Sequence, residues 1–266
     1  MASRSPWLHE EEARAQGIEL SYELFDFTER QLGDDALPAV LADLRATGYA
    51  GVNVTYPFKQ AVIPLLDDLA ESAEMVGAVN TIAMQDGRLI GHNTDMQGFR
   101  DSVAEGLPGA ALDRVLQLGA GGAGSAVASA LLSLGVGRLD IADVDATRAQ
   151  MLAAALADRF GADRVATRVP GDDSTDRADG IVNATPMGMA AHPAPPIDPA
   201  RIDPRHWVAD IVYFPLETEL LRVARSKGCR TLDGSGMVIG QAALAFEIFT
   251  GRRANKERMR RSFFAN

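Results

Sequence analysis

The chain has 266 residues, 47% of them hydrophobic, and a formal net charge of −10. This length is enough for about one to two domains with a substantial core, and the composition is that of a globular protein rather than a disordered one. The acidic balance argues against a nucleic-acid-binding protein, and the single cysteine, Cys229, excludes an intramolecular disulfide, which fits a reducing cytoplasm.

Short apolar runs alternate with helical stretches along the chain. This alternation predicts βαβ units and therefore an α/β fold with a parallel sheet. The elements expected in the first part are a helix at 6–16, a strand at 20–25, a helix at 36–47, a strand at 51–55, a helix at 61–69, a hairpin of 78–84 and 88–93, and a connecting helix at 95–105.

A second unit is expected from residue 115 onward. Its predicted strands are 115–118, 138–142, 180–183, 207–211 and 230–232, and its predicted helices are 124–134, 146–160 and 218–227, followed by a last helix at 239–250. The uncharged stretch 115–137 is long enough to cross a bilayer. Its glycines favour a strand, a turn and a buried helix instead, so no membrane partner is expected.

A glycine-rich turn follows the strand predicted at 115–118. It reads Gly119-Ala120-Gly121-Gly122-Ala123-Gly124, the G-x-G-x-x-G spacing of dinucleotide-binding turns, between a strand and a helix. The first glycine permits the tight turn, the second lets the backbone approach a pyrophosphate, and the third allows close packing of helix and strand. N–H groups at the helix N-terminus would bind the phosphates. The alternative is a structural glycine turn that binds nothing.

Two acidic residues follow the strand predicted at 138–142. Asp143 lies where a carboxylate accepts hydrogen bonds from the adenosine ribose hydroxyls, and Asp145 is the second candidate. The alternative for either residue is a solvated loop acid.

Four polar clusters lie in the first hundred residues. They are Ser3-Arg4-Ser5-Pro6, Asn53-Val54-Thr55-Tyr56-Pro57-Phe58-Lys59, Asn80-Thr81 and Asn93-Thr94-Asp95. Ser5 and Pro6 suit the N-cap and first position of a helix, and the alternative for this cluster is a helix cap alone. Because open α/β sheets bind ligands at strand ends, the recurrence of such clusters at these ends favours a binding site. The four histidines are scattered without ligand spacing, so no metal is expected.

An ordered set of motifs over nearly the entire chain resembles the shikimate and quinate dehydrogenase family. The motifs are S-R-S-P at 3–6, N-V-T-Y-P-F-K at 53–59, G-A-V-N-T at 77–81, H-N-T-D at 92–95, G-A-G-G-A-G at 119–124, N-A-T-P-M-G-M at 183–189, D-I-V-Y-F-P-L-E-T-E-L-L at 210–221 and D-G-S-G-M…Q at 233–241.

The resemblance implies a two-domain enzyme with its active site in the cleft between the domains. We expect a substrate domain with a mixed sheet at 1–103, completed by 237–266, and a Rossmann-type dinucleotide-binding domain at 104–236. In the family a strand precedes the S-x-S-P segment. Either the chain lacks that strand, or Met1 is an internal position of a longer product, and an open position is expected beside 51–55 unless another segment covers it.

The resemblance also implies roles for particular residues. Lys59 and Asp95 would form the catalytic acid–base pair. The residues expected to bind substrate, together with Asp95, are Ser3, Ser5, Asn53, Thr55, Asn80, Tyr213 and Gln241. Those expected to contact the cofactor, besides the glycine turn, are Asp143, Arg148, Asn183, Thr185, Met187 and Gly234.

NAD is the expected cofactor, in preference to NADP. NADP-using members carry an Asn-Arg-Thr type segment where this chain has Asp143-Val144-Asp145, so the arginine that would pair with a 2′-phosphate is absent from that position. The substrate is expected to be shikimate and also quinate. Two alternatives stay open, a dehydrogenase for an amino analogue of shikimate and a non-catalytic shikimate- or quinate-sensing module. Monomer and homodimer are equally compatible with the sequence.

Overall fold

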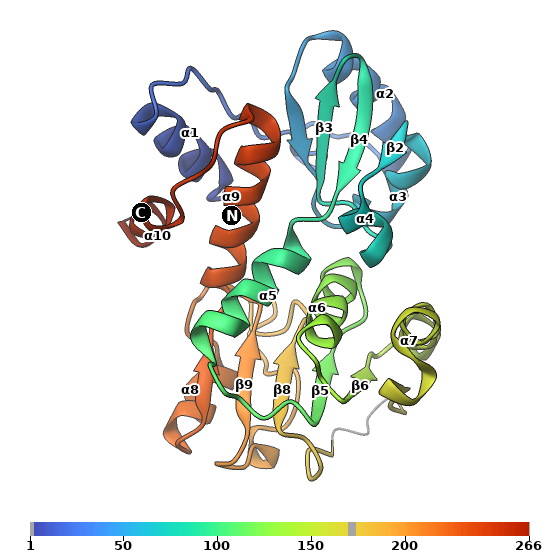
Figure 1. The fold of residues 1–266 in the computed structure, drawn as a ribbon, viewed down its shortest axis with the longest axis vertical. Helices are drawn as coiled ribbons and strands as arrows, with labels where there is room; N and C mark the ends of the chain where they lie inside the picture. The colour runs from blue at the N-terminus through green and yellow to red at the C-terminus, as the bar shows by residue number, and fades with distance from the viewer. Residues whose placement is uncertain (1–2, 170–173, 266) are drawn as a thin grey trace. The chain divides into compact units, whose positions relative to one another are not determined.

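The computed structural model describes residues 3–169 and 174–265. The described chain divides into two compact units, each with its own sheet (Figure 1). Unit 1 consists of the described residues up to Thr94 together with those from Ile239 onward, and unit 2 is Asp95–Val238.

The sheet of unit 1 is mixed, as the sequence predicts. Its strands are β1 (Gly51–Asn53), β2 (Asp68–Leu69), β3 (Thr81–Gln85) and β4 (Arg88–His92), in the order β1-β3-β4-β2. The pairs β1–β3 and β3–β4 are antiparallel, and β2–β4 is parallel. The predicted hairpin is β3–β4, and both residues of its turn have positive φ, 51° at Asp86 and 74° at Gly87, as a tight hairpin turn requires.

Helices form the rest of the regular structure of unit 1, and some of them pack against the sheet. They are α1 (Ser5–Ala15), α2 (Leu37–Ala46), α3 (Phe58–Ala61), α4 (Glu71–Val76), the part of α9 (Ser235–Thr250) from Ile239 onward, and α10 (Lys256–Ala265). Leu37 and Leu41 of α2 pack with Ala73 of α4 against Ile82 and Leu89 of the hairpin. The helices α4 and α10 have no counterpart in the sequence prediction.

Two elements predicted in unit 1 are wrong. Residues 20–25 form no strand, because side chains rather than a backbone ladder hold this extended segment: Glu10 accepts a hydrogen bond from the Tyr22 N–H at 3.0 Å. The helix predicted at 61–69 ends at Ala61, is followed by a short 3₁₀ turn containing Pro64, and gives way to strand β2. Proline lacks the N–H that a continuing helix needs.

Strand β1 is an edge strand within the described residues, since its ladder partner there is β3. Residues 3–5 form no strand. The sequence predicts an open position beside β1 or a segment that covers it. The extended segment contacts this strand through a side chain, because the Tyr22 hydroxyl donates to Asn53 Oδ1 at 2.9 Å.

The described residues of unit 2 form a six-stranded parallel sheet in the order β10-β9-β8-β5-β6-β7. The strands are β5 (Arg114–Leu118), β6 (Arg138–Ala142), β7 (Val165–Thr167), β8 (Gly180–Asn183), β9 (Trp207–Asp210) and β10 (Arg230–Leu232). This is the Rossmann order, which reverses direction between β5 and β8, and ligands of such sheets bind outside the carboxyl ends of the strands at that point. Sequence reasoning missed the three-residue strand β7.

The helices of unit 2 agree with the predicted pattern. They are α5 (Asp95–Gly106), α6 (Gly122–Ser133), α7 (Ala146–Phe160) and α8 (Glu219–Ser226). The uncharged stretch 115–137 contains β5, the glycine turn and α6. No helix in the described part of the chain is long and apolar enough to span a membrane.

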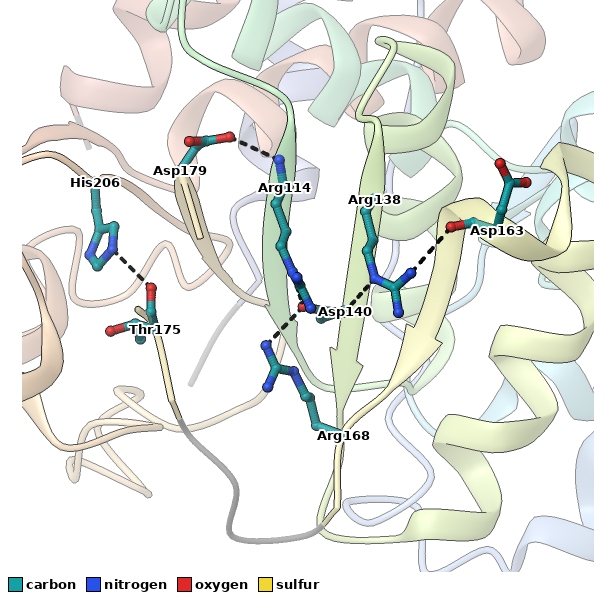
Figure 2. Close-up of polar contacts among 8 residues, drawn as sticks. All are labelled: Arg114, Arg138, Asp140, Asp163, Arg168, Thr175, Asp179 and His206. Atoms are coloured by element: carbon teal, nitrogen blue, oxygen red, sulfur yellow. Dashed lines mark hydrogen bonds and ion pairs between the residues drawn. The ribbon is translucent and has the colours of Figure 1, made fainter. Parts of the chain in front are cut away.

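A buried carboxylate on β6 pairs with arginines on β5, on β6 and directly after β7 (Figure 2). Asp140 on β6 is 2% exposed and pairs with Arg114 Nε at 2.6 Å, Arg168 Nη2 at 2.9 Å and Arg138 Nε at 3.4 Å. Burial alone would raise the pKa of Asp140, but hydrogen bonds and charge attraction from Arg114 and Arg168 outweigh it and lower that pKa. The carboxylate therefore stabilises the edge of the sheet in its ionised form.

Replacing Asp140 with alanine is expected to lower the free energy of unfolding by about 2–3 kcal/mol. Losing one partner of a buried ion pair costs about 3–5 kcal/mol, and the partly exposed guanidinium groups reduce that figure. Glu217→Ala is the control, because Glu217 pairs with Arg225 at 2.6 Å with both side chains about half exposed, and such pairs contribute about 0–1 kcal/mol. Urea unfolding at neutral pH measures both, and equal losses would contradict a stabilising role for Asp140.

The Asp140 carboxylate should also make the folding stability of the protein depend on pH. Because its pKa is lowered in the folded protein, its contribution is complete above the ordinary aspartate pKa of about 4. It is lost as pH falls through the lower folded value. Asp140→Ala should therefore narrow the difference in stability between neutral and acidic solution.

Candidate dinucleotide site and active site

The glycine turn at the end of β5 has the shape that a pyrophosphate needs. Gly119 has φ +100°, and a Cβ there would lie 2.7 Å from the Ala184 carbonyl oxygen. A Cβ at Gly124 would lie 2.4 Å from the Gly119 carbonyl oxygen, so helix and turn pack closely. A Cβ at Gly121 would meet nothing within 4 Å. The backbone at Gly121 thus borders open space where α6 begins, and a dinucleotide fits this cradle.

Gln117 holds this turn in place, a role that sequence reasoning missed. Its side chain is fully buried on β5, and its amide nitrogen donates to the carbonyl oxygens of Gly119 and Gly124, both at 2.8 Å. These two bonds join the first and last glycines of the motif. A polar residue within an apolar strand, two positions before the first glycine, was the available signal.

Asp143 lies against the glycine turn, at the end of β6. Its Oδ2 accepts a hydrogen bond from the Ala120 N–H at 2.7 Å, and its Oδ1 accepts one from the Asp145 N–H at 2.9 Å. Asp145 caps α7 by accepting from the N–H groups of Thr147 and Arg148. The two acids therefore have different tasks: Asp143 holds the turn, and Asp145 holds the start of the next helix.

Arg148 lies beside both acids. Its guanidinium is 3.7 Å from Asp143 Oδ1 and 3.6 Å from Asp145 Oδ2, and the side chain is 53% exposed. Val144, at the position of the missing arginine, is 96% exposed. The end of β6 thus presents two carboxylates and one guanidinium.

The loop after β8 is organised by Asn183, which is fully buried. Its Oδ1 accepts from the Thr185 N–H and hydroxyl at 3.0 and 2.6 Å, and its Nδ2 donates to the Met187 carbonyl at 2.9 Å. Nδ2 also donates to Asp210 Oδ1 at 2.8 Å, on the neighbouring strand β9. Burial raises the pKa of Asp210 to about 6, although hydrogen bonds from Val212, Thr218 and Asn183 act against this.

Two more residues predicted for the site lie in the loops that follow β9 and β10. Gly234 allows a close backbone approach, since a Cβ there would lie 2.4 Å from the Ile211 carbonyl oxygen. Tyr213 is 36% exposed. Gly119, Asn183 and Gly234 all lie at carboxyl ends of the parallel strands.

A chain of polar side chains in unit 1 joins the polar clusters that the sequence singles out. We call it the Ser5–Thr94 chain, and its members in order are Ser5, Tyr22, Asn53, Thr81, Asn80 and Thr94. The Ser5 side chain is close enough to the Tyr22 phenol to act on its pKa, and the four hydrogen bonds from Tyr22 onward measure 2.9–3.2 Å. The chain thereby connects the polar clusters to one another.

The start of α1 differs from the prediction at Ser5. The helix begins at Ser5, so this residue is not the N-cap, and Pro6 occupies the second helical position rather than the first. The Ser3 hydroxyl oxygen accepts from the Ser5 N–H at 3.2 Å. Ser3 thus caps the backbone at this end, which leaves the Ser5 hydroxyl available to Tyr22.

The remaining predicted residues of unit 1 lie near this chain or on α9. Thr55 is exposed after β1, and its carbonyl accepts from the Phe58 N–H at 2.9 Å as α3 begins. Lys59 is half-buried on α3, and its carbonyl accepts from the Val79 N–H at 2.7 Å, directly before Asn80. Gln241 is half-buried on α9.

Asp95 begins helix α5 in unit 2 and is 5% exposed. It directly follows Thr94, the last member of the Ser5–Thr94 chain. Within the described residues, no group of three or more His, Cys, Asp and Glu side chains could hold a metal ion.

Comparison with known proteins identifies two family models, whose matched residues lie in unit 1 apart from 234–238. Residues 1–82 match the model of the shikimate dehydrogenase substrate binding domain. Residues 234–262 match the model of the shikimate 5′-dehydrogenase C-terminal domain.

Full-length relatives have two kinds of name. A shikimate dehydrogenase (NADP(+)) of Pseudarthrobacter chlorophenolicus is 51% identical over 98% of this chain and 90% of its own. A quinate/shikimate dehydrogenase (NAD(+)) of Corynebacterium efficiens is 48% identical over 99% of this chain and 94% of its own. Quinate dehydrogenase from Corynebacterium glutamicum, solved in complex with NAD, matches with a TM-score of 0.91 and 46% identity over 99% of this chain and 95% of that one.

Proposed function

The chain belongs to the shikimate dehydrogenase family of oxidoreductases, and from this premise we propose that it interconverts shikimate and 3-dehydroshikimate, and also quinate and 3-dehydroquinate, with NAD preferred over NADP. The observation that carries the substrate proposal is the Ser5–Thr94 chain, because it joins residues of several family motifs through hydrogen bonds in one unit. The contact between Asp143 and the Ala120 N–H supports the cofactor proposal.

Two parts of the chain have separate main tasks in this proposal. We assign residues 1–103 and 237–266 to substrate binding and residues 104–236 to dinucleotide binding. The hydroxyls of Ser3 and Ser5 bind the substrate carboxylate. Thr55, Asn80, Asp95 and Gln241 bind the ring hydroxyls, and Tyr213 helps to close the site.

The reaction needs a proton relay at the substrate hydroxyl. A bound nicotinamide dinucleotide supplies the hydride acceptor. As the carbinol carbon is oxidised, its hydroxyl must lose a proton to a group within hydrogen-bond reach. In the oxidative direction Lys59 takes this proton on Nζ as a neutral amine, and in the reductive direction it returns the proton as an ammonium. Asp95 is assigned to orient the Lys59 side-chain nitrogen and to hydrogen-bond with the same substrate hydroxyl.

The dinucleotide is held by the elements at the carboxyl ends of the parallel strands. Backbone N–H groups at the start of α6 bind the pyrophosphate. Asp143 accepts hydrogen bonds from the ribose hydroxyls, and Arg148 lies beside it. The segment from Asn183 to Met187 and the backbone at Gly234 border the nicotinamide.

A spectrophotometric assay tests the proposal directly. Incubation with NAD is expected to produce NADH with shikimate and with quinate. Turnover with neither acid but with an amino analogue of shikimate would identify the related dehydrogenase instead. Binding of shikimate by calorimetry without NADH formation under any condition would identify a sensing module and overturn the catalytic assignment.

A further inference from the structure

Tyr22 lies between two of the residues proposed to bind substrate. It belongs to the extended segment after α1, where its N–H donates to Glu10 at 3.0 Å. Its ring packs against His9, with 4.9 Å between ring centroids. Its hydroxyl donates to Asn53 Oδ1 at 2.9 Å, and the Ser5 side chain is close enough to act on the pKa of the phenol. Backbone, ring and hydroxyl are all held, so the phenol has a defined position.

We propose that Tyr22 is a positioning residue for the substrate, whose hydroxyl orients the Ser5 hydroxyl at the start of α1 and the Asn53 amide on β1. This inference rests on the proposed function, in which Ser5 binds the carboxylate and Asn80 binds the ring. Tyr22 itself does not touch the reacting atoms. It fixes the distance and orientation between the two ends of the substrate site in unit 1.

The Asn53 amide explains how the effect reaches Asn80. Its two amide hydrogens are directed to Thr81 Oγ1 at 3.0 Å and to the Asn80 carbonyl at 3.4 Å. Thr81 in turn donates to Asn80 Oδ1 at 3.2 Å. Tyr22 donates to the carbonyl oxygen of the same amide. Loss of the Tyr22 hydroxyl therefore frees the Asn53 side chain to rotate and weakens the orientation of the Asn80 side chain.

The phenol keeps its role across the working pH range. Burial raises the pKa of Tyr22 to about 12, and the nearby Ser5 side chain only partly opposes this. The hydroxyl is therefore protonated at neutral pH and remains a donor to Asn53. His9, which packs against the ring, is fully buried, and its Nδ1 lies 2.9 Å from the Ser5 carbonyl oxygen. The packing around the phenol thus also bears on Ser5.

Tyr22→Phe tests the inference because it removes the hydroxyl and keeps the ring against His9. We expect KM for shikimate to rise about fivefold to tenfold, the effect of one hydrogen bond, with kcat within about twofold and KM for NAD unchanged. Tyr49→Phe is the matched control. The Tyr49 hydroxyl donates at 2.7 Å to Glu23, which lies in the same extended segment as Tyr22, and neither residue belongs to the Ser5–Thr94 chain. The KM of the Tyr49→Phe variant for shikimate should therefore stay at the wild-type value.

A double-mutant cycle separates positioning from general loosening. If Tyr22 acts through Ser5, Tyr22→Phe and Ser5→Ala together should raise KM by less than the product of the single effects. Additive effects, an equal rise in KM for Tyr49→Phe, or an equal rise in KM for NAD would each overturn the positioning role. Should Tyr22→Phe fail to fold, Asn53→Asp breaks the next link, and a wild-type KM for that variant would overturn the inference.

The outcomes also distinguish this inference from the proposed function. A wild-type protein that turns over neither shikimate nor quinate contradicts the proposed function. A wild-type protein that oxidises shikimate, with a Tyr22→Phe variant of unchanged KM, leaves the function intact and overturns the role of Tyr22 alone.

Discussion

Replacement of Lys59 by alanine is expected to lower kcat for shikimate oxidation by about 10²–10⁴-fold, the usual contribution of a general acid–base group. The fold should survive, because the substitution keeps the backbone bond that joins this residue to the neighbouring segment: the Lys59 carbonyl accepts from the Val79 N–H at 2.7 Å. The side chain is half-buried on a single-turn helix. Steady-state kinetics at saturating NAD, with thermal unfolding of both proteins, measure the two effects.

Lys256→Ala is the control for the loss of one positive charge. Lys256 is exposed at the start of α10 in the same unit, so its replacement should leave kcat at the wild-type value. Lys59→Arg keeps the positive charge, but a guanidinium does not give up its proton in proteins. The Lys59→Arg variant should therefore also have a low kcat if proton transfer is the task of Lys59. A Lys59→Ala enzyme that keeps half of the wild-type kcat would contradict the assignment of Lys59 as the acid–base group.

The elements predicted correctly are those whose signal is local. The glycine turn could be recognised because the spacing of its glycines is a local pattern, and Gly124 packs directly against the Gly119 carbonyl within that pattern. The hairpin β3–β4 followed from the Asp86-Gly87 turn. The long apolar strands of unit 2 were equally readable, since a buried parallel strand is a continuous apolar run.

The elements missed depend on partners far away in the sequence. Glu12 is a polar helix residue by pattern, yet it is 1% exposed and its carboxylate accepts two hydrogen bonds from Arg258 at 2.7 and 2.8 Å. This pair fixes α1 to α10, a charged helix with weak periodicity. No local pattern relates two residues at opposite ends of the chain.

The same reason explains what was missed at the candidate site. Tyr22 was assigned to a strand because aromatic and β-branched residues favour strands, but its hydroxyl reaches Asn53 on another element. Gln117 looked like part of an apolar strand, although it donates to two carbonyls of the glycine turn. The sequence indicated which segments are polar, and the tertiary structure determines which side chains meet.

A preference for NAD over NADP is the second large effect that we expect, and the charges at the end of β6 are the basis of this expectation. NADP differs from NAD by a 2′-phosphate of about −1.5 to −2 charges. Two carboxylates and one guanidinium, those of Asp143, Asp145 and Arg148, lie at this position, with 3.7 and 3.6 Å between the guanidinium and the two acids. The net charge of these three groups is negative, and the Arg148 guanidinium already pairs with both carboxylates. A 2′-phosphate would therefore lie beside Asp143 without a full counter-charge.

The size of this preference follows from simple electrostatics. Two unit charges 4 Å apart interact by about 4 kcal/mol at an effective dielectric of 20. Because solvent and salt screen this exposed edge, we reduce the repulsion to about 1.5–3 kcal/mol. That range corresponds to a ratio of about 10 to 150 in kcat/KM in favour of NAD. Measurement with both cofactors at saturating shikimate and moderate salt checks it, and equal values would show that Asp143 does not lie at the ribose.

Two substitutions at this position should move the ratio in opposite directions. Asp143→Asn with Val144→Arg removes the repelling carboxylate and places a guanidinium on the exposed side chain that follows β6, so the ratio should shift toward NADP by at least about tenfold. Arg148→Ala removes the existing cation and should shift it further toward NAD. Since the hydrogen bond from the Ala120 N–H can pass to the carbonyl oxygen of the introduced side-chain amide, the glycine turn should keep its shape in the double variant. An unchanged ratio in both proteins would place the 2′ position elsewhere in unit 2.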